Sequence, residues 1–185
     1  MTTVYVITRV LTYFGALLRT FWEHLVCRIC KIPAEDVSAF KNSELCGHVE
    51  HHIIYKRSDA FLMCYLPFVM NFILACCFLL TGSYRLFYLG DTTTYQAYIF
   101  IWLGISCAAN CVPSFEDMLS FKDCVYGGKS IFLKVILAPF FAVICAGACL
   151  EKYSLTFLLS IGFAVAFPYV FSVVFSVFDI VGTLL

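Results

Sequence analysis

Residues 60–81, AFLMCYLPFVMNFILACCFLLT, decide the fold class. The stretch carries no charged side chain, and its few polar groups include Asn71. A helix needs about 20 mainly apolar residues to cross the hydrocarbon core of a bilayer. Pro67 falls inside the stretch, and membrane helices tolerate such a proline because neighbouring groups satisfy the freed backbone. These residues therefore predict a transmembrane helix.

Other apolar segments have the same character. Three of them are predicted spans, at about residues 94–112, 131–150 and 155–178. Residues 3–27 are also long and apolar, but Arg9, Arg19 and Glu23 make this a marginal span, which either packs inside the bundle or lies partly in the membrane interface. The expected fold is an all-α, polytopic transmembrane bundle of about five helices.

The composition excludes an ordinary soluble domain. Hydrophobic residues make up 62% of the chain, charged residues 13%, and the mean hydropathy is +0.92, whereas soluble domains average about 45–50% apolar and about 25% charged residues. We expect one integral membrane domain over residues 1–185, multi-pass in the cell membrane, with the lipid bilayer as its first partner. The N-terminus lacks a small-residue cleavage site and is not expected to be a removed signal peptide. A formal net charge of zero gives no sign of a nucleic-acid partner.

Basic residues near the segment ends predict the orientation. They are concentrated at 28–57 and 122–129, while the intervening short loops carry Arg85 and Lys152 alone. The positive-inside rule then places the segments 28–58 and 113–130 in the cytoplasm, and the loops near 83–93 and 151–154 outside. The N-terminus is outside if the first segment spans.

The polar segment 28–58 is expected to hold short structure. Pro33 suits the first position of a helix, so PAEDVSAF, residues 33–40, predicts a helical turn or more. The following residues 44–57 are rich in β-branched residues and histidine after a glycine, and they predict a short strand or β-hairpin. The chain is also cysteine-rich, with 11 cysteines. Those inside apolar segments are expected to pack as small hydrophobes.

Three clusters of polar residues are candidate sites, because charged groups near a bilayer are costly. In the first, Glu23, His24, Cys27 and Cys30 are spaced by three or four residues and can share a helix face. Histidine and cysteine at these spacings are soft ligands suited to zinc, although a tetrahedral site needs further ligands from elsewhere.

The second cluster is Cys46, His48, Glu50, His51 and His52, which with His24 contains every histidine of the chain. His48 and His52 would share one face of a helix, and His48, Glu50 and His52 one face of a strand, so either geometry could bind a metal. A solvated loop at the interface is the alternative. In the third cluster, Asn110 precedes Ser114 and Asp117. The alternative to a functional site here is the N-terminus of a helix, with Ser114 as the capping residue and Asp117 as the acidic residue three positions later.

These motifs resemble, in degraded form, the intramembrane metalloproteases of the site-2 protease family, which carry H-E-x-x-H on an early helix and a later N-x-x-P followed by an aspartate. Residues 22–26, WEHLV, are similar to the first motif, and Asn110-x-x-Pro113 with Asp117 to the second. The chain also resembles small, uncharacterised membrane proteins of Gram-positive bacteria that keep a fuller form of these motifs. The resemblance implies Glu23 as general base and Asp117 as a zinc ligand.

Both histidines of the first motif are missing, because Trp22 and Val26 occupy their positions. Three functions follow as hypotheses. The first is a non-catalytic interaction or regulatory protein, with another membrane protein or a membrane-bound peptide as partner. The second is a zinc hydrolase with Glu23 as base and a rearranged ligand set, drawn from His24, His48, His51, His52, Cys27 and Asp117. The third is a small transporter or channel. It is suggested by polar residues within the apolar segments, including Arg9, Arg19, Asn71 and Lys134.

Overall fold

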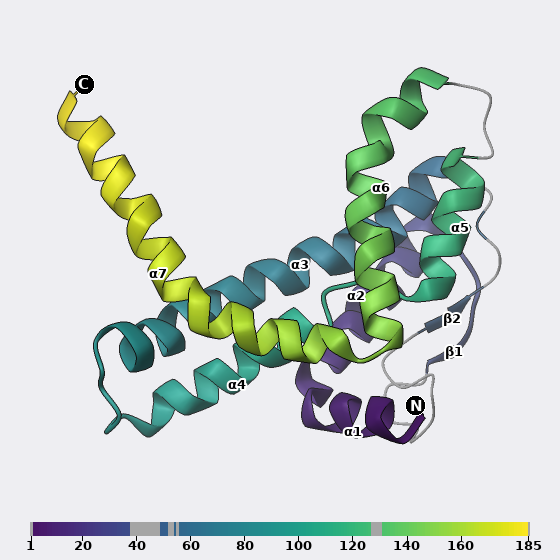
Figure 1. Ribbon diagram of the computed structural model, residues 1–185. Helices are drawn as coiled ribbons and strands as arrows, with labels where there is room; N and C mark the ends of the chain where they lie inside the picture. Colours follow the sequence, from purple (N-terminus) through teal and green to yellow (C-terminus); the bar gives the residue numbers. More distant parts are fainter. Residues whose placement is uncertain (1, 38–48, 52–53, 55, 127–130, 185) are drawn as a thin grey trace.

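The computed structural model describes residues 2–37, 49–51, 54, 56–126 and 131–184 (Figure 1). The fold is predominantly helical, as predicted, but the predicted number of about five helices is wrong: the described part contains seven α-helices and one short π-helix. Their bounds are α1 Thr2–Leu11, α2 Tyr13–Cys30, α3 Arg57–Ser83, η1 Tyr84–Tyr88, α4 Tyr95–Ala109, α5 Phe115–Tyr126, α6 Ile131–Lys152 and α7 Leu155–Leu184.

The predicted span 3–27 is divided between α1 and α2 at Thr12. Thr12 leaves the helical conformation with φ −110° and ψ 30°. Its hydroxyl donates to the Thr8 carbonyl oxygen at 2.8 Å, and its own carbonyl oxygen accepts a hydrogen bond from the Asn110 side chain at 3.1 Å. The helix therefore breaks at Thr12, where the Asn110 side chain binds the backbone, although the apolar sequence pattern continues through this position.

Among the described residues, three helical segments are long and apolar enough to cross a membrane: Arg57–Tyr88, Lys134–Glu151 and Leu155–Ser176. Tyr95–Ala109, which falls in the predicted span 94–112, is apolar but shorter. At 1.5 Å per residue it is roughly 22 Å long, less than the hydrocarbon core of about 30 Å.

Helices α3, α4 and α7 lie alongside one another and form one part of the molecule (Figure 1). Glycines allow the close contact of α3 with α4, because a Cβ at Gly104 would lie 2.6 Å from Leu79 Cδ2 and one at Gly82 would lie 2.7 Å from the Ala97 carbonyl oxygen. At the far end, the Tyr169 hydroxyl donates to the Phe87 carbonyl oxygen at 3.2 Å. Beyond this contact the yellow end of α7 extends away from the other helices (Figure 1).

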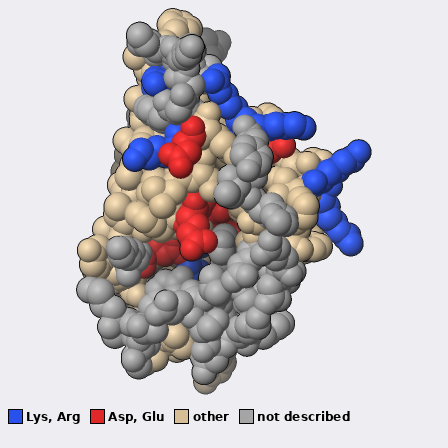
Figure 2. Space-filling view, turned by 90° about the vertical axis from the view of Figure 1, so that its right-hand side faces the viewer, with Lys and Arg blue, Asp and Glu red and all other residues tan. Residues whose placement is uncertain are grey.

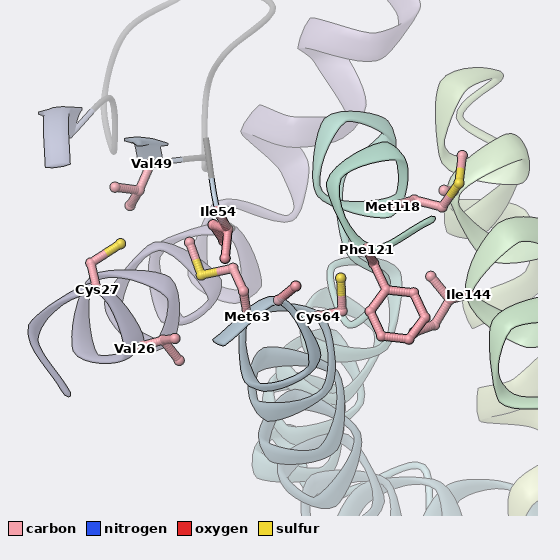
Figure 3. Close-up of a cluster of buried hydrophobic side chains, with 11 residues drawn as sticks. Val26, Cys27, Val49, Ile54, Met63, Cys64, Met118, Phe121 and Ile144 are labelled. Atoms are coloured by element: carbon pink, nitrogen blue, oxygen red, sulfur yellow. The ribbon is translucent and has the colours of Figure 1, made fainter. Parts of the chain in front are cut away.

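The first half of α3 packs against α2 and α5, and α6 runs beside α5 at a steep angle to α3 (Figure 1). A second packing unit forms here around a cluster of buried side chains (Figure 3). Its members come from α2, β2, α3, α5, α6 and the segment between β2 and α3. The labelled ones are Val26, Cys27, Val49, Ile54, Met63, Cys64, Met118, Phe121 and Ile144.

Two short strands, β1 Ala34–Val37 and β2 Val49–His51, pair in antiparallel fashion. The helical turn predicted from Pro33 is therefore wrong over Ala34–Val37, because pairing with β2 outweighs the local preference. The strand predicted within residues 44–57 lies at Val49–His51. Its partner is β1, and the residues between the strands, 38–48, lie outside the described part.

Candidate functional site

A buried network of charges joins α1, α2 and α6. The Glu151 carboxylate at the end of α6 accepts hydrogen bonds from two arginines, Arg9 of α1 and Arg19 of α2, the latter at 2.7 Å. Arg19 Nε also donates to Glu23 Oε1 at 2.8 Å. All four side chains are buried, and Arg19 and Glu23 are each only 1% exposed. Charges so far from water must be paired closely, and these two arginines and two glutamates form three ion pairs.

Glu23 also connects the network to the strands. Its second carboxylate oxygen, Oε2, accepts a hydrogen bond from the backbone N–H of Val49 at 3.0 Å. Both oxygens of this side chain are therefore bound, one by a cation and one by the start of β2. A carboxylate held in this way is positioned to stabilise the fold of α2 against β2.

Asparagine side chains continue the network into the helix bundle. Asn110, at the end of α4, binds Arg9 through its oxygen, and its amide nitrogen donates to the carbonyl oxygens of Thr12 and Ser106. Asn71, in the middle of α3, donates to the carbonyl oxygens of Asn110 and Gly15, at 3.0 and 3.3 Å. The end of α4 therefore lies level with the middle of α3.

Asp117 forms a second polar group at the start of α5. Its backbone N–H donates to Ser114 Oγ at 3.1 Å, and the Ser114 hydroxyl donates to Asp117 Oδ2 at 2.7 Å. This is the capped helix start considered for the third cluster. The other oxygen, Oδ1, lies 3.1 Å from His51 Nε2. Two residues predicted as metal ligands are thus in contact.

The remaining predicted residues are more dispersed. Cys27 is 2% exposed within the hydrophobic cluster and His24 is half-buried on α2. Glu50 belongs to β2, with its side chain outside the described part. Cys46, His48 and His52 also lie outside it. Among the described residues, no group of three or more histidine, cysteine, aspartate or glutamate side chains is arranged to hold a metal ion.

The sequence interpretation missed Glu151, which joins the two arginines. Residues 151–154 were expected in a loop on the outer side, opposite to Asn110, yet Arg9 binds Glu151 and Asn110 together. The alternation predicted from the basic residues did not anticipate that one arginine binds both groups. The sequence did contain a signal for Glu151, because a carboxylate at the end of a long apolar segment is costly unless it is paired.

Two buried polar atoms of the network have no hydrogen-bond partner among the described residues. Arg19 Nη2 is buried, and no described residue accepts a hydrogen bond from it. Asn71 Oδ1 likewise has no donor in the described part of the chain. Such groups cost about 1–3 kcal/mol each when they stay unpaired.

Acidic side chains are visible in a hollow in the middle of one face, and lysine and arginine side chains project from the upper part and the right-hand edge of the same face (Figure 2). The face belongs to the side of the molecule that carries α5, α6 and the strands. This face therefore carries charged side chains of both signs. Comparison of the chain with protein-family models, with curated proteins and with solved structures gives no match.

Proposed function

We propose that the chain is an integral membrane protein whose bilayer-spanning part is formed by α3, α4 and α7. The three helices lie alongside one another between the level of Asn71 and Asn110 and the level of Phe87 and Tyr169. Along α3 and η1 this interval is about 16 residues, or roughly 24 Å, somewhat less than the hydrocarbon core of about 30 Å. The charged network then lies at the cytoplasmic boundary, and α2, α5 and the strands lie on the cytoplasmic side.

At this boundary we propose a binding function without turnover: the protein holds or regulates another membrane protein or a membrane-bound peptide. The paired state of Glu23 supports this proposal. A general base must accept a proton from a water molecule or substrate within hydrogen-bonding distance. Glu23 is 1% exposed, and both its oxygens are already bound, by Arg19 and by the Val49 N–H.

The test is a cleavage assay with membrane-bound peptide substrates in reconstituted vesicles. We expect the wild-type protein and Glu23→Gln to give the same background rate. Cleavage by the wild type that is lost in Glu23→Gln would contradict the proposal, because it would make Glu23 a catalytic group.

A zinc hydrolase is the second candidate, favoured by the 3.1 Å contact between His51 and Asp117. In this alternative the two side chains are ligands, completed by histidines outside the described part, with Glu23 as the base. Elemental analysis of protein purified without chelators tests it. Binding of about one zinc ion per chain, lost in Asp117→Asn, would favour the hydrolase. The absence of bound zinc would exclude this alternative.

A further inference from the structure

A small polar cavity lies where α1, the end of α4 and the turn between α6 and α7 meet. Arg9, Asn110 and Glu151 of the charged network line it, together with Ser154 and Thr156. Its volume, counted as space open to the centre of a water molecule, is about 10 Å³. This is about the space that a single water molecule needs, and it is too small for a larger ligand.

One oxygen of Glu151 is not used by the charged network. Glu151 Oε1 accepts hydrogen bonds from Arg9 and Arg19, whereas no described residue donates a hydrogen bond to Oε2. The Glu151 side chain is only 8% exposed, so bulk water does not surround it. A buried carboxylate oxygen without a donor is costly. Glu151 Oε2 is therefore available to a donor that occupies the cavity.

Two hydroxyl groups that line the cavity are also unused. Ser154 adopts the left-handed conformation with φ 57°, and its N–H donates to the Glu151 carbonyl oxygen at 2.8 Å. Thr156 lies in the first turn of α7. Neither hydroxyl is bonded to a described residue, whereas the hydroxyls of Ser160 and Ser172 on the same helix donate to backbone carbonyl oxygens. Three polar groups that line one small space thus have no partner in the described part of the chain.

The charges around the cavity favour a neutral ligand. The two arginines and two glutamates of the network balance one another. A cation in the cavity would lie near the Arg9 guanidinium, and an anion would lie near the Glu151 carboxylate, so each would meet a charge of its own sign. Water is neutral, and one water molecule can donate to a carboxylate while it accepts from hydroxyl groups.

We propose that this cavity binds one ordered water molecule. The water donates a hydrogen bond to Glu151 Oε2 and accepts hydrogen bonds from the hydroxyls of Ser154 and Thr156. It thereby joins the charged network to the first turn of α7, one of the helices proposed to span the bilayer. The proposed embedding places Asn110 at the cytoplasmic boundary, so water reaches this site without crossing hydrocarbon. The water site does not depend on the proposed binding function, and the two can fail separately.

A crystal structure of the full chain in a lipidic phase, at a resolution that shows ordered water, tests the proposal. We expect one density peak in the cavity, at about 2.7–3.2 Å from Glu151 Oε2 and from both hydroxyls. Thr156→Val nearly keeps the shape of threonine but lacks the hydroxyl. In this variant the peak height, relative to other ordered waters, should fall roughly twofold or more, because the water loses one of its few partners.

Two further variants serve as controls, and both should retain the peak. Thr156→Ser keeps the hydroxyl at the cavity. Thr81→Val removes an exposed hydroxyl on α3, which donates to the Cys77 carbonyl oxygen far from the site. An unchanged peak in Thr156→Val, or an equal loss in Thr81→Val, would contradict the role of the Thr156 hydroxyl.

The map of the wild type decides the identity of the ligand even if a variant does not fold. An empty cavity would overturn the proposal, and so would a hydroxyl group that donates directly to Glu151 Oε2. Contacts from several oxygen atoms that are markedly shorter than hydrogen bonds would identify a metal cation in place of water, which would also overturn it.

Discussion

At the scale of single residues, the central feature is a carboxylate shared by two arginines. Glu151 accepts hydrogen bonds from Arg9 and Arg19, and Arg19 is bound in turn to Glu23. The sequence placed the two arginines and Glu23 inside an apolar segment, which marks them as paired groups, but it could not identify the partner. Glu151 is 132 residues from Arg19 along the chain, and no local pattern encodes a contact over such a separation.

Removing the shared carboxylate is expected to be severely destabilising. In Glu151→Gln, two buried guanidinium groups lose their common counter-ion, and breaking one partner of a buried pair costs about 3–5 kcal/mol. Unfolding of the detergent-solubilised protein by sodium dodecyl sulfate measures the change. Glu116→Gln is the control, since Glu116 is an exposed carboxylate on α5, and a change within about 0.5 kcal/mol is expected for it. Similar effects in both variants would contradict a special role for Glu151.

A pH-dependent contact is expected in the loop before α4. Asp91 accepts hydrogen bonds from the Thr93 N–H, the Thr93 hydroxyl and the Thr94 hydroxyl, and these hold the pKa of Asp91 below its ordinary value of 3.8. A lowered pKa means that the stabilisation is complete above pH 3.8 and is lost as the pH falls through the lowered value. The Thr93 amide resonance in NMR spectra should shift with this lowered pKa. An Asp91 pKa of 3.8 or more, with an unresponsive Thr93 amide, would show that the loop contact is absent.

At the scale of helices, the sequence predicted apolar segments well and their ends poorly. Residues 60–81 lie wholly inside α3, because charge-free runs of this length have no other stable form in a membrane. The break at Thr12 and the strand Ala34–Val37 depend on contacts with Asn110 and with β2. The first contact joins residues 98 apart in the sequence. The second joins two strands across an intervening segment, and neither could be predicted from local composition.

The contact between α2 and α4 depends on a glycine. The Gly15 N–H donates to Ser106 Oγ at 2.8 Å, and a Cβ at Gly15 would overlap the Ser106 carbonyl group, lying 2.5 Å from its carbon. We expect Gly15→Ala to cost about 3 kcal/mol or more, because backbone atoms cannot move aside as side chains can. The same unfolding titration measures it.

Gly162→Ala on α7 is the matched substitution, since a Cβ there meets nothing within 4 Å. Its effect should stay below about 1 kcal/mol, in the stabilising direction, because alanine favours helices. Equal costs at the two glycines would mean that α2 and α4 are not in close contact.

At the scale of the whole molecule, the fold divides into two regions joined by α3. One region is the apolar group of α3, α4 and α7, and the other contains α2, α5, the strands and the hydrophobic cluster (Figures 1 and 3). The sequence correctly predicted a predominantly helical, largely apolar protein. It could not predict that Arg9 brings Glu151 and Asn110 together, because no local pattern encodes which helix ends meet.

The central claim is that Glu23 stabilises this molecule and does not catalyse a reaction in it. Catalytic residues commonly sit at some cost in stability, and replacing them often leaves a protein as stable or more stable. A structural anchor has the opposite property. The most direct measurement is therefore the free energy of unfolding of Glu23→Gln against the wild type. We predict a loss of about 3 kcal/mol or more, because Arg19 loses one of its two counter-ions. An unchanged or increased stability would contradict the account and return Glu23 to the role of a general base.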